Sequence, residues 1–202
     1  HEQAVDWYSR ARRQQPHHAK LLNNLAIEYR AAGHADSSRT LWQESLSLEE
    51  DYAEAHYNLG TSYYLAGEHE RALPHLLRAV QLAPDSVRYH SNAAAAYRAA
   101  GRPLQAVEHW SDAIRIDPTY VDGYFNIAFT LQYDLKKPQE ALRHWVAARA
   151  LAPQDGDIIM HATQALLDVG RTSEAITWLR GFVEQNPQHP QRQRLETALR
   201  TI

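Results

Sequence analysis

Residues 53–86 read AEAHYNLGTSYYLAGEHERALPHLLRAVQLAPDS and contain the pattern that decides the fold. In the first half, the residues of one predicted helix face recur at helical spacing: His56, Leu59, Gly60 and Tyr63. Gly67 then ends this helix, because the chain needs a residue in the left-handed conformation to leave it. A second helix face follows at Ala72, Leu76 and Ala79, and Pro84 prevents that helix from continuing. The stretch therefore predicts two helices joined by a tight turn.

The same pattern returns every 34 residues, and four asparagines mark the period: Asn24, Asn58, Asn92 and Asn126. A fixed period of this length is typical of helical hairpins stacked into a solenoid. Five full units are predicted, at residues 19–52, 53–86, 87–120, 121–155 and 156–189. Three tryptophans recur at one position of the second helices and are expected in the core between helices: Trp42, Trp110 and Trp145.

Two units depart from the regular pattern. The unit at 121–155 is one residue longer than the others, and Leu-Lys-Lys at 135–137 replaces its glycine turn. The unit at 19–52 has Glu50 in place of the proline that follows the second helix elsewhere. Without that proline, the second helix of this unit is expected to extend towards Asp51.

The two ends of the chain are also informative. Residues 1–18 match only the second helix of a truncated repeat, so more protein is expected upstream. Trp7 and Tyr8 then lack the first helix that would cover them, and self-association through this end is expected. Residues 190–202 begin with Pro190, a favoured first helical position, and are expected to form a capping helix. Its apolar residues would cover the last hairpin: Leu195 and Leu199.

The motif resembles the tetratricopeptide repeat (TPR), whose pattern is aromatic-x-x-Leu-Gly-x-x-Tyr, then Ala-x-x-x-Phe, then Ala and Pro. Residues 53–86 depart from this pattern at His56, which replaces the first aromatic residue, and at Leu76, which replaces the phenylalanine. The resemblance covers essentially the whole chain. It implies an all-α fold, a right-handed TPR superhelix (α-solenoid) in which residues 1–202 form a single domain.

Composition narrows the classes of partner and activity. The 202 residues are 44% hydrophobic with a formal net charge of −3, so nucleic acid is not an expected partner. No apolar run approaches the roughly 20 residues of a membrane span, so membrane insertion is not expected. The chain has no cysteine, which fits an oxidising or a reducing compartment equally well. No phosphate loop or catalytic constellation stands out, so we expect neither enzymatic activity nor a cofactor.

In the TPR family the first helices line the concave surface, so the resemblance implies that the four asparagines form a row there, called here the asparagine ladder. A carboxamide accepts from a peptide N–H and donates to a peptide C=O, so we expect a protein or extended peptide as partner. The ladder resembles the one in the TPR region of O-linked N-acetylglucosamine transferases. By the same register, Asn23 and Gln132 are expected on this surface. The predicted peptide-binding residues are Asn24, Asn58, Asn92, Asn126, Tyr57, Tyr64, Arg88, Arg98, Phe125, Phe129 and His161.

Alternatives stay open for these residues and for the whole array. The asparagines can instead bond within or between hairpins, and neighbouring helices can cover the aromatic side chains. The array can be an adaptor, the substrate-recognition arm of a larger enzyme such as a glycosyltransferase, or a solenoid that assembles through its ends. Basic residues of the first helices gather in the N-terminal half and acidic ones in the C-terminal half, which would orient a ligand. Histidines at equivalent repeat positions are expected roughly 10 Å apart, too far to share a zinc ion, so no metal site is expected.

Overall fold

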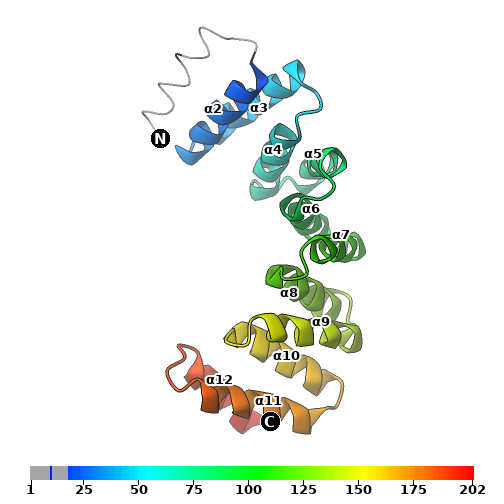
Figure 1. Ribbon diagram of the computed structural model, residues 1–202, viewed down its shortest axis with the longest axis vertical. Coiled ribbons are helices and arrows are strands. Elements are labelled where there is room, and N and C mark those ends of the chain that lie inside the picture. Colours follow the sequence, from blue (N-terminus) through cyan, green and yellow to red (C-terminus); the bar gives the residue numbers. More distant parts are fainter. Residues whose placement is uncertain (1–9, 11–17) are drawn as a thin grey trace. The chain divides into compact units, whose positions relative to one another are not determined.

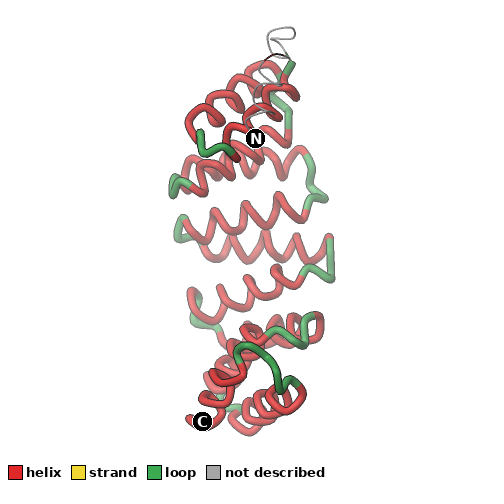
Figure 2. The backbone as a smooth tube through the Cα atoms, turned by 90° about the vertical axis from the view of Figure 1, so that its left-hand side faces the viewer, coloured by secondary structure: helices red, strands yellow, loops and turns green. Residues whose placement is uncertain are grey.

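The computed structural model describes Arg10 and residues 18–202, and within them all regular structure is helical (Figures 1 and 2). The all-α prediction is therefore confirmed. The chain forms two compact units, His1–Arg102 and Pro103–Ile202, called here the N-terminal and C-terminal units. The expected helix with Trp7 and Tyr8 lies outside the described residues, and the single domain over 1–202 stays a prediction. None of the described helices combines the length and apolar character that a bilayer crossing requires.

The described part of the N-terminal unit contains two helical hairpins and one further helix. Its helices are α2 (Ala19–Ala31), α3 (Ala35–Leu48), α4 (Ala53–Leu65), α5 (His69–Leu82) and α6 (Val87–Ala99). Helix α2 packs on α3, and α4 packs on α5. The prediction that the second helix extends towards Asp51 is wrong. Helix α3 ends at Leu48, and the N–H of Glu49 closes its last turn on the Ser45 carbonyl at 3.0 Å.

A glycine at the crossing of α4 and α5 lets the two helices approach closely. A Cβ added at Gly60 would lie 2.7 Å from Leu76 Cγ and 3.1 Å from the carbonyl oxygen of Ala72. Both distances are shorter than van der Waals contact, so a larger residue would push the helices apart. Gly60 therefore marks the point where the two helices cross.

The C-terminal unit contains six α-helices and one short π-helical turn. Its elements are α7 (Pro103–Ile116), α8 (Val121–Phe129), η1 (Thr130–Asp134), α9 (Pro138–Leu151), α10 (Gly156–Asp168), α11 (Thr172–Gln185) and α12 (Arg192–Thr201). Helix α12 begins two residues after Pro190, and Leu195 is fully buried against Ile159, Leu179 and Phe182. The last helix therefore covers the apolar face of the hairpin before it.

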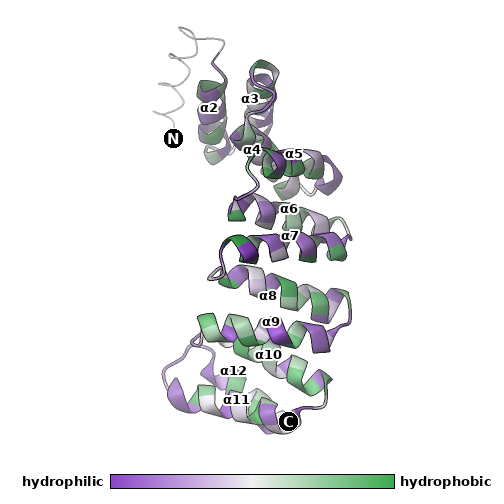
Figure 3. Ribbon diagram, turned by 45° about the vertical axis from the view of Figure 1, so that its right-hand side comes forward, coloured by the Kyte–Doolittle hydropathy of each residue, from purple (hydrophilic) through white to green (hydrophobic). Residues whose placement is uncertain are grey.

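Apolar and hydrophilic residues share the described helices (Figure 3), and apolar side chains from successive helices form the core. Trp42 and Trp145 have no exposed surface, and Trp110 is 2% exposed. The prediction that these tryptophans lie in the core is therefore confirmed.

The extra residue of the unit at 121–155 is absorbed in the turn η1. The regular turns are closed by a hydrogen bond between residues five apart, such as Glu68 N–H to the Tyr63 carbonyl at 2.9 Å. Here the corresponding bond joins Lys137 N–H to the Leu131 carbonyl, six residues apart. Lys136, at φ 57°, takes the left-handed position that glycines occupy in the other turns at φ 73–87°. A single insertion therefore widens one turn into a π-helix and leaves the next helix in phase.

Candidate functional site

Side-chain amides join the first helices of the N-terminal unit. Asn23 of α2 is buried, and its Oδ1 accepts two hydrogen bonds, from Trp42 Nε1 at 3.1 Å and from Asn58 Nδ2 at 2.9 Å. Trp42 is fully buried and Asn58 is 8% exposed, so both donors depend on this acceptor. The expectation that Asn23 lies on the binding surface is wrong, because its amide satisfies a buried indole. Asn58 therefore ties α4 to α2.

The next asparagine makes a similar connection one repeat further on. Asn92 of α6 is half-buried and donates through Nδ2 to Tyr57 Oη at 2.8 Å and Thr61 Oγ1 at 3.2 Å, both on α4. Tyr57 stacks on Tyr89 with ring centroids 4.9 Å apart, and the Arg88 guanidinium lies 4.4 Å from the Tyr57 centroid. The second contact is a cation–π interaction. The N-terminal unit therefore brings Tyr57, Arg88 and Asn92 together.

The remaining predicted residues of this unit have other surroundings. Asn24 is half-buried, and its Oδ1 accepts from the neighbouring Asn23 at 3.3 Å. Tyr64 of α4 lies beside His69 of α5 with ring centroids 5.5 Å apart, and Arg98 is half-buried in the last turn of α6. Within the described residues, Tyr64 makes no ring contact or hydrogen bond with Tyr57, and so lies outside that group.

In the C-terminal unit, aromatic rings surround one histidine. The ring of His161, on α10, stacks on Trp145 with centroids 5.5 Å apart and an interplanar angle of 11°. Phe125, Phe129 and Tyr133 contact it edge-on at 5.7, 5.4 and 5.5 Å. Burial lowers the pKa of His161, so the ring is neutral at pH 7, and its Nδ1 shares a hydrogen bond of 2.9 Å with the Tyr133 hydroxyl. The structure thus unites three predicted residues, and these five rings are called here the aromatic cluster.

A polar chain runs beside the aromatic cluster. Gln132 is 4% exposed, and its Oε1 accepts from Trp145 Nε1 at 2.9 Å. Its Nε2 donates to Asp168 Oδ2 at 2.8 Å, and Gln164 Nε2 donates to Asp168 Oδ1 at 2.8 Å. The expectation that Gln132 lies on the surface is wrong. Phe125 occupies the repeat position of Asn23, so the buried indole of Trp145 finds its acceptor in the widened turn instead.

Asn126 differs from the other asparagines of the ladder. It is half-buried on α8, the helix that also carries Phe125 and Phe129 of the aromatic cluster. Within the part of the chain that the structure describes, its carboxamide makes no hydrogen bond. Its two donor hydrogens and its acceptor oxygen are therefore available to a ligand.

Sequence reasoning missed Tyr133, and it placed Asp168 only among the acidic residues expected to orient a ligand, not among the predicted peptide-binding residues. Tyr133 lies in the π-helical turn, where no fixed repeat position applies. Asp168 lies seven residues after His161 on the same helix, so helical spacing from His161 was a signal that could have found it. Burial, and then the charge of Asp168, raises the pKa of Tyr133.

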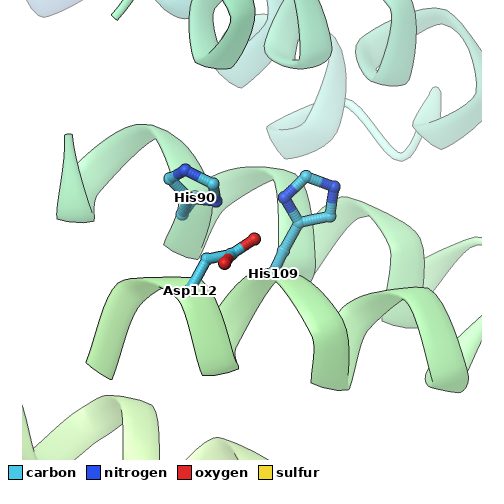
Figure 4. A group of neighbouring side chains, drawn as sticks. All are labelled: His90, His109 and Asp112. Atoms are coloured by element: carbon cyan, nitrogen blue, oxygen red, sulfur yellow. The ribbon is translucent and has the colours of Figure 1, made fainter. Parts of the chain in front are cut away.

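Several histidines have partners inside their own unit. Figure 4 shows His109 and Asp112 one turn apart on α7, and His90 on α6. His90 Nε2 donates to the backbone carbonyl six residues earlier at 3.0 Å. The Nδ1 atoms of His56 and His75 lie 3.1 Å apart, and burial lowers the pKa of His75 to about 4. Among the described residues of either unit taken by itself, no three histidine, aspartate or glutamate side chains lie close enough together to bind one metal ion.

Two segments of the chain match family models described as tetratricopeptide repeat, residues 23–87 and residues 132–199. No curated protein matches the sequence. The solved structure of YrrB, described as a TPR protein with an unusual peptide-binding site, is similar with a TM-score of 0.80 and 16% identity. That match covers 98% of this chain and 100% of YrrB.

Two structures of MamA are also similar. One has a TM-score of 0.78 and 16% identity, over 84% of this chain and 92% of that one. MamA from Desulfovibrio magneticus RS-1 has a TM-score of 0.71 and 19% identity, over 77% of this chain and 87% of that one. At such identities the likeness shows a shared fold, and the two matched segments independently show the repeat. The chain belongs to the tetratricopeptide repeat family.

Proposed function

We propose that the chain is a protein-interaction scaffold that binds an extended peptide or protein segment along the first helices of its repeats, partly through the asparagine ladder. The observation that carries the proposal is the unbonded carboxamide of Asn126 on the same helix as Phe125 and Phe129, whose rings stay partly exposed. An unengaged amide suits a peptide backbone, and partly exposed rings suit its apolar side chains. YrrB, which has the same fold, is described as having a peptide-binding site.

The asparagines have different roles in this proposal. Asn58 is 8% exposed and already donates to Asn23, so it mainly holds α4 on α2. Asn92 has its Nδ2 engaged by Tyr57 and offers its Oδ1 as an acceptor. Asn126 offers both donor and acceptor groups, which makes it the strongest backbone contact of the ladder.

The test is to select binders to the full chain from a library of random peptides of about 12 residues, which reach about 40 Å when extended. Asn126→Ala should weaken a selected peptide by about two- to twelvefold, the loss of one net hydrogen bond, with the thermal midpoint unchanged. Asn58→Ala should instead lower the midpoint. Gln188→Ala, an exposed carboxamide beyond α11, is the matched control and should change neither quantity.

Two results would count against the proposal. One is a library selection that yields no peptide with reproducible affinity for the folded chain. The other is a selected peptide whose affinity is unchanged by both Asn126→Ala and Phe129→Ala.

A further inference from the structure

The first helices of the C-terminal unit carry charge of one sign. Helices α8 and α10 and the turn η1 contain four aspartates and no lysine or arginine: Asp122, Asp134, Asp157 and Asp168. At one end of α10, Arg194 of α12 lies 3.5 Å from Asp157 Oδ1, which also accepts from Gln191 at 2.9 Å. Helix α12 thus partly neutralises the negative charge at the start of α10, but it does not neutralise the charge at the other end.

Asp168, at the other end of α10, is held without a cation. Each of its carboxylate oxygens accepts one side-chain amide, from Gln132 and from Gln164, both at 2.8 Å. No lysine or arginine pairs with it in the described part of the chain. The cations of the adjoining turns have partners of their own, Lys137 on Glu140 at 2.9 Å and Arg171 on Glu174 at 2.5 Å, and Lys136 is exposed.

Neutral amides fix the position of a carboxylate but leave its charge uncompensated, and each oxygen keeps a further lone pair. The Asp168 side chain is therefore oriented before a ligand arrives, and a guanidinium or ammonium group would add charge-assisted hydrogen bonds. Because Gln132 is itself buried and bonded to Trp145, this orientation is anchored in the core.

The aromatic cluster supplies the second component of a cation site. Tyr133 directly follows Gln132, which donates to Asp168, and the Tyr133 ring centroid is 4.6 Å from that of Phe129. Both rings are partly exposed. Aromatic faces attract cations and also pack on the aliphatic stems of lysine and arginine. Neutral His161 adds no opposing charge.

We propose that Asp168, together with the partly exposed rings of Phe129 and Tyr133, is a binding site for the side chain of a lysine or arginine in the bound peptide. This inference rests on the proposed peptide-binding function and deepens it. The C-terminal unit then selects a segment that combines a basic residue with apolar neighbours, and Asn126 contacts its backbone.

The charge of the side chain is tested with three small probes: Nα-acetyl-arginine amide, Nα-acetyl-lysine amide and the neutral isostere Nα-acetyl-citrulline amide. Each is titrated into the isotopically labelled full chain and followed by the amide shifts of residues 129–134 and 161–168. The two cations should bind at least fivefold more tightly than the citrulline probe. Raising the salt from about 0.05 to 0.5 M should remove most of the difference, because screening weakens partly exposed charges.

Asp168→Asn should abolish the preference for the cations, and Glu184→Gln, which removes an exposed carboxylate on α11, should leave it intact. Equal binding of arginine and citrulline probes, or an unchanged preference in Asp168→Asn, would overturn the site. Peptides from the library test whose affinity survives replacement of every lysine and arginine by citrulline would also overturn it, while leaving the scaffold function in place. A cation preference that depends on Asp168 without any peptide binder would support the site and refute the scaffold.

Discussion

Replacing Asn23 by alanine tests the side-chain hydrogen bonds that join helices α2, α3 and α4 of the N-terminal unit. The substitution removes the acceptor of two donors, the indole Nε1 of Trp42, which is fully buried, and Nδ2 of Asn58, which is 8% exposed. A buried donor left without a partner costs about 1–3 kcal/mol. Two such donors, of which the less buried one can recover part of its loss from water, predict a decrease of about 2–4 kcal/mol in the free energy of unfolding.

Urea unfolding followed by circular dichroism measures this decrease, and Asn24→Ala is the matched control. Asn24 accepts a single long bond of 3.3 Å from Asn23, so its loss should cost at most about 0.5 kcal/mol. A double-mutant cycle isolates the indole. In a Trp42→Phe background the N–H is absent, and the cost of Asn23→Ala should fall by about 1–2 kcal/mol.

Two results would refute the reasoning. A cost of Asn23→Ala below about 1 kcal/mol would mean that water satisfies both donors. A coupling energy to Trp42→Phe near zero would mean that the indole hydrogen bond contributes nothing.

Three further predictions concern packing, backbone strain and pH. Gly60→Ala should destabilise the chain by about 1–3 kcal/mol because its Cβ meets the neighbouring helix, while Gly181→Ala, with nothing within 4 Å of the new Cβ, should stabilise it by about 0.5–1 kcal/mol; the difference in denaturation midpoint checks both. Lys136→Gly should raise the free energy of unfolding by up to about 1 kcal/mol, because glycine occupies φ 57° without strain; a lowered stability would contradict this. Burial lowers the pKa of His75 and His144 to about 4, so the unfolded chain takes up protons at a higher pH than the folded chain. The free energy of unfolding should therefore fall between about pH 6.5 and pH 4, by about 1–2 kcal/mol for each part-exposed ring. The double variant His75→Gln, His144→Gln should lose this dependence of stability on pH.

The helix pairs could be predicted because their determinants lie at fixed positions of the repeat. Gly60 marks the helix crossing, and the glycine turns carry the left-handed residue that each hairpin needs. The widened turn could be predicted only in part. The sequence shows that residues 121–155 contain one extra residue, but whether it enters a loop or a helix depends on hydrogen bonds that place Lys136 at a glycine position.

The site was harder to predict, because the partners of buried indoles do not follow the repeat. Trp42 and Trp145 occupy one register, yet one takes its acceptor from Asn23 and the other from Gln132. The choice depends on Phe125, which fills the position that Asn23 holds three repeats earlier in the N-terminal unit and has no acceptor to offer. At these two indoles, side chains that the repeat period alone places towards solvent are therefore drawn into the core as acceptors.

The asparagine hydrogen bonds between successive first helices of the N-terminal unit have a consequence for the gain or loss of whole repeats. Asn58 and Asn92 each reach a partner 35 residues earlier, Asn23 in one case and Tyr57 in the other. Loss of residues 53–86 would bring Asn92 opposite Asn23, and doubling of that segment would bring a second Asn58 opposite Tyr57 and Thr61. Deletion or duplication of one whole repeat therefore still gives each asparagine a hydrogen-bond partner of a kind that binds an asparagine in the present chain.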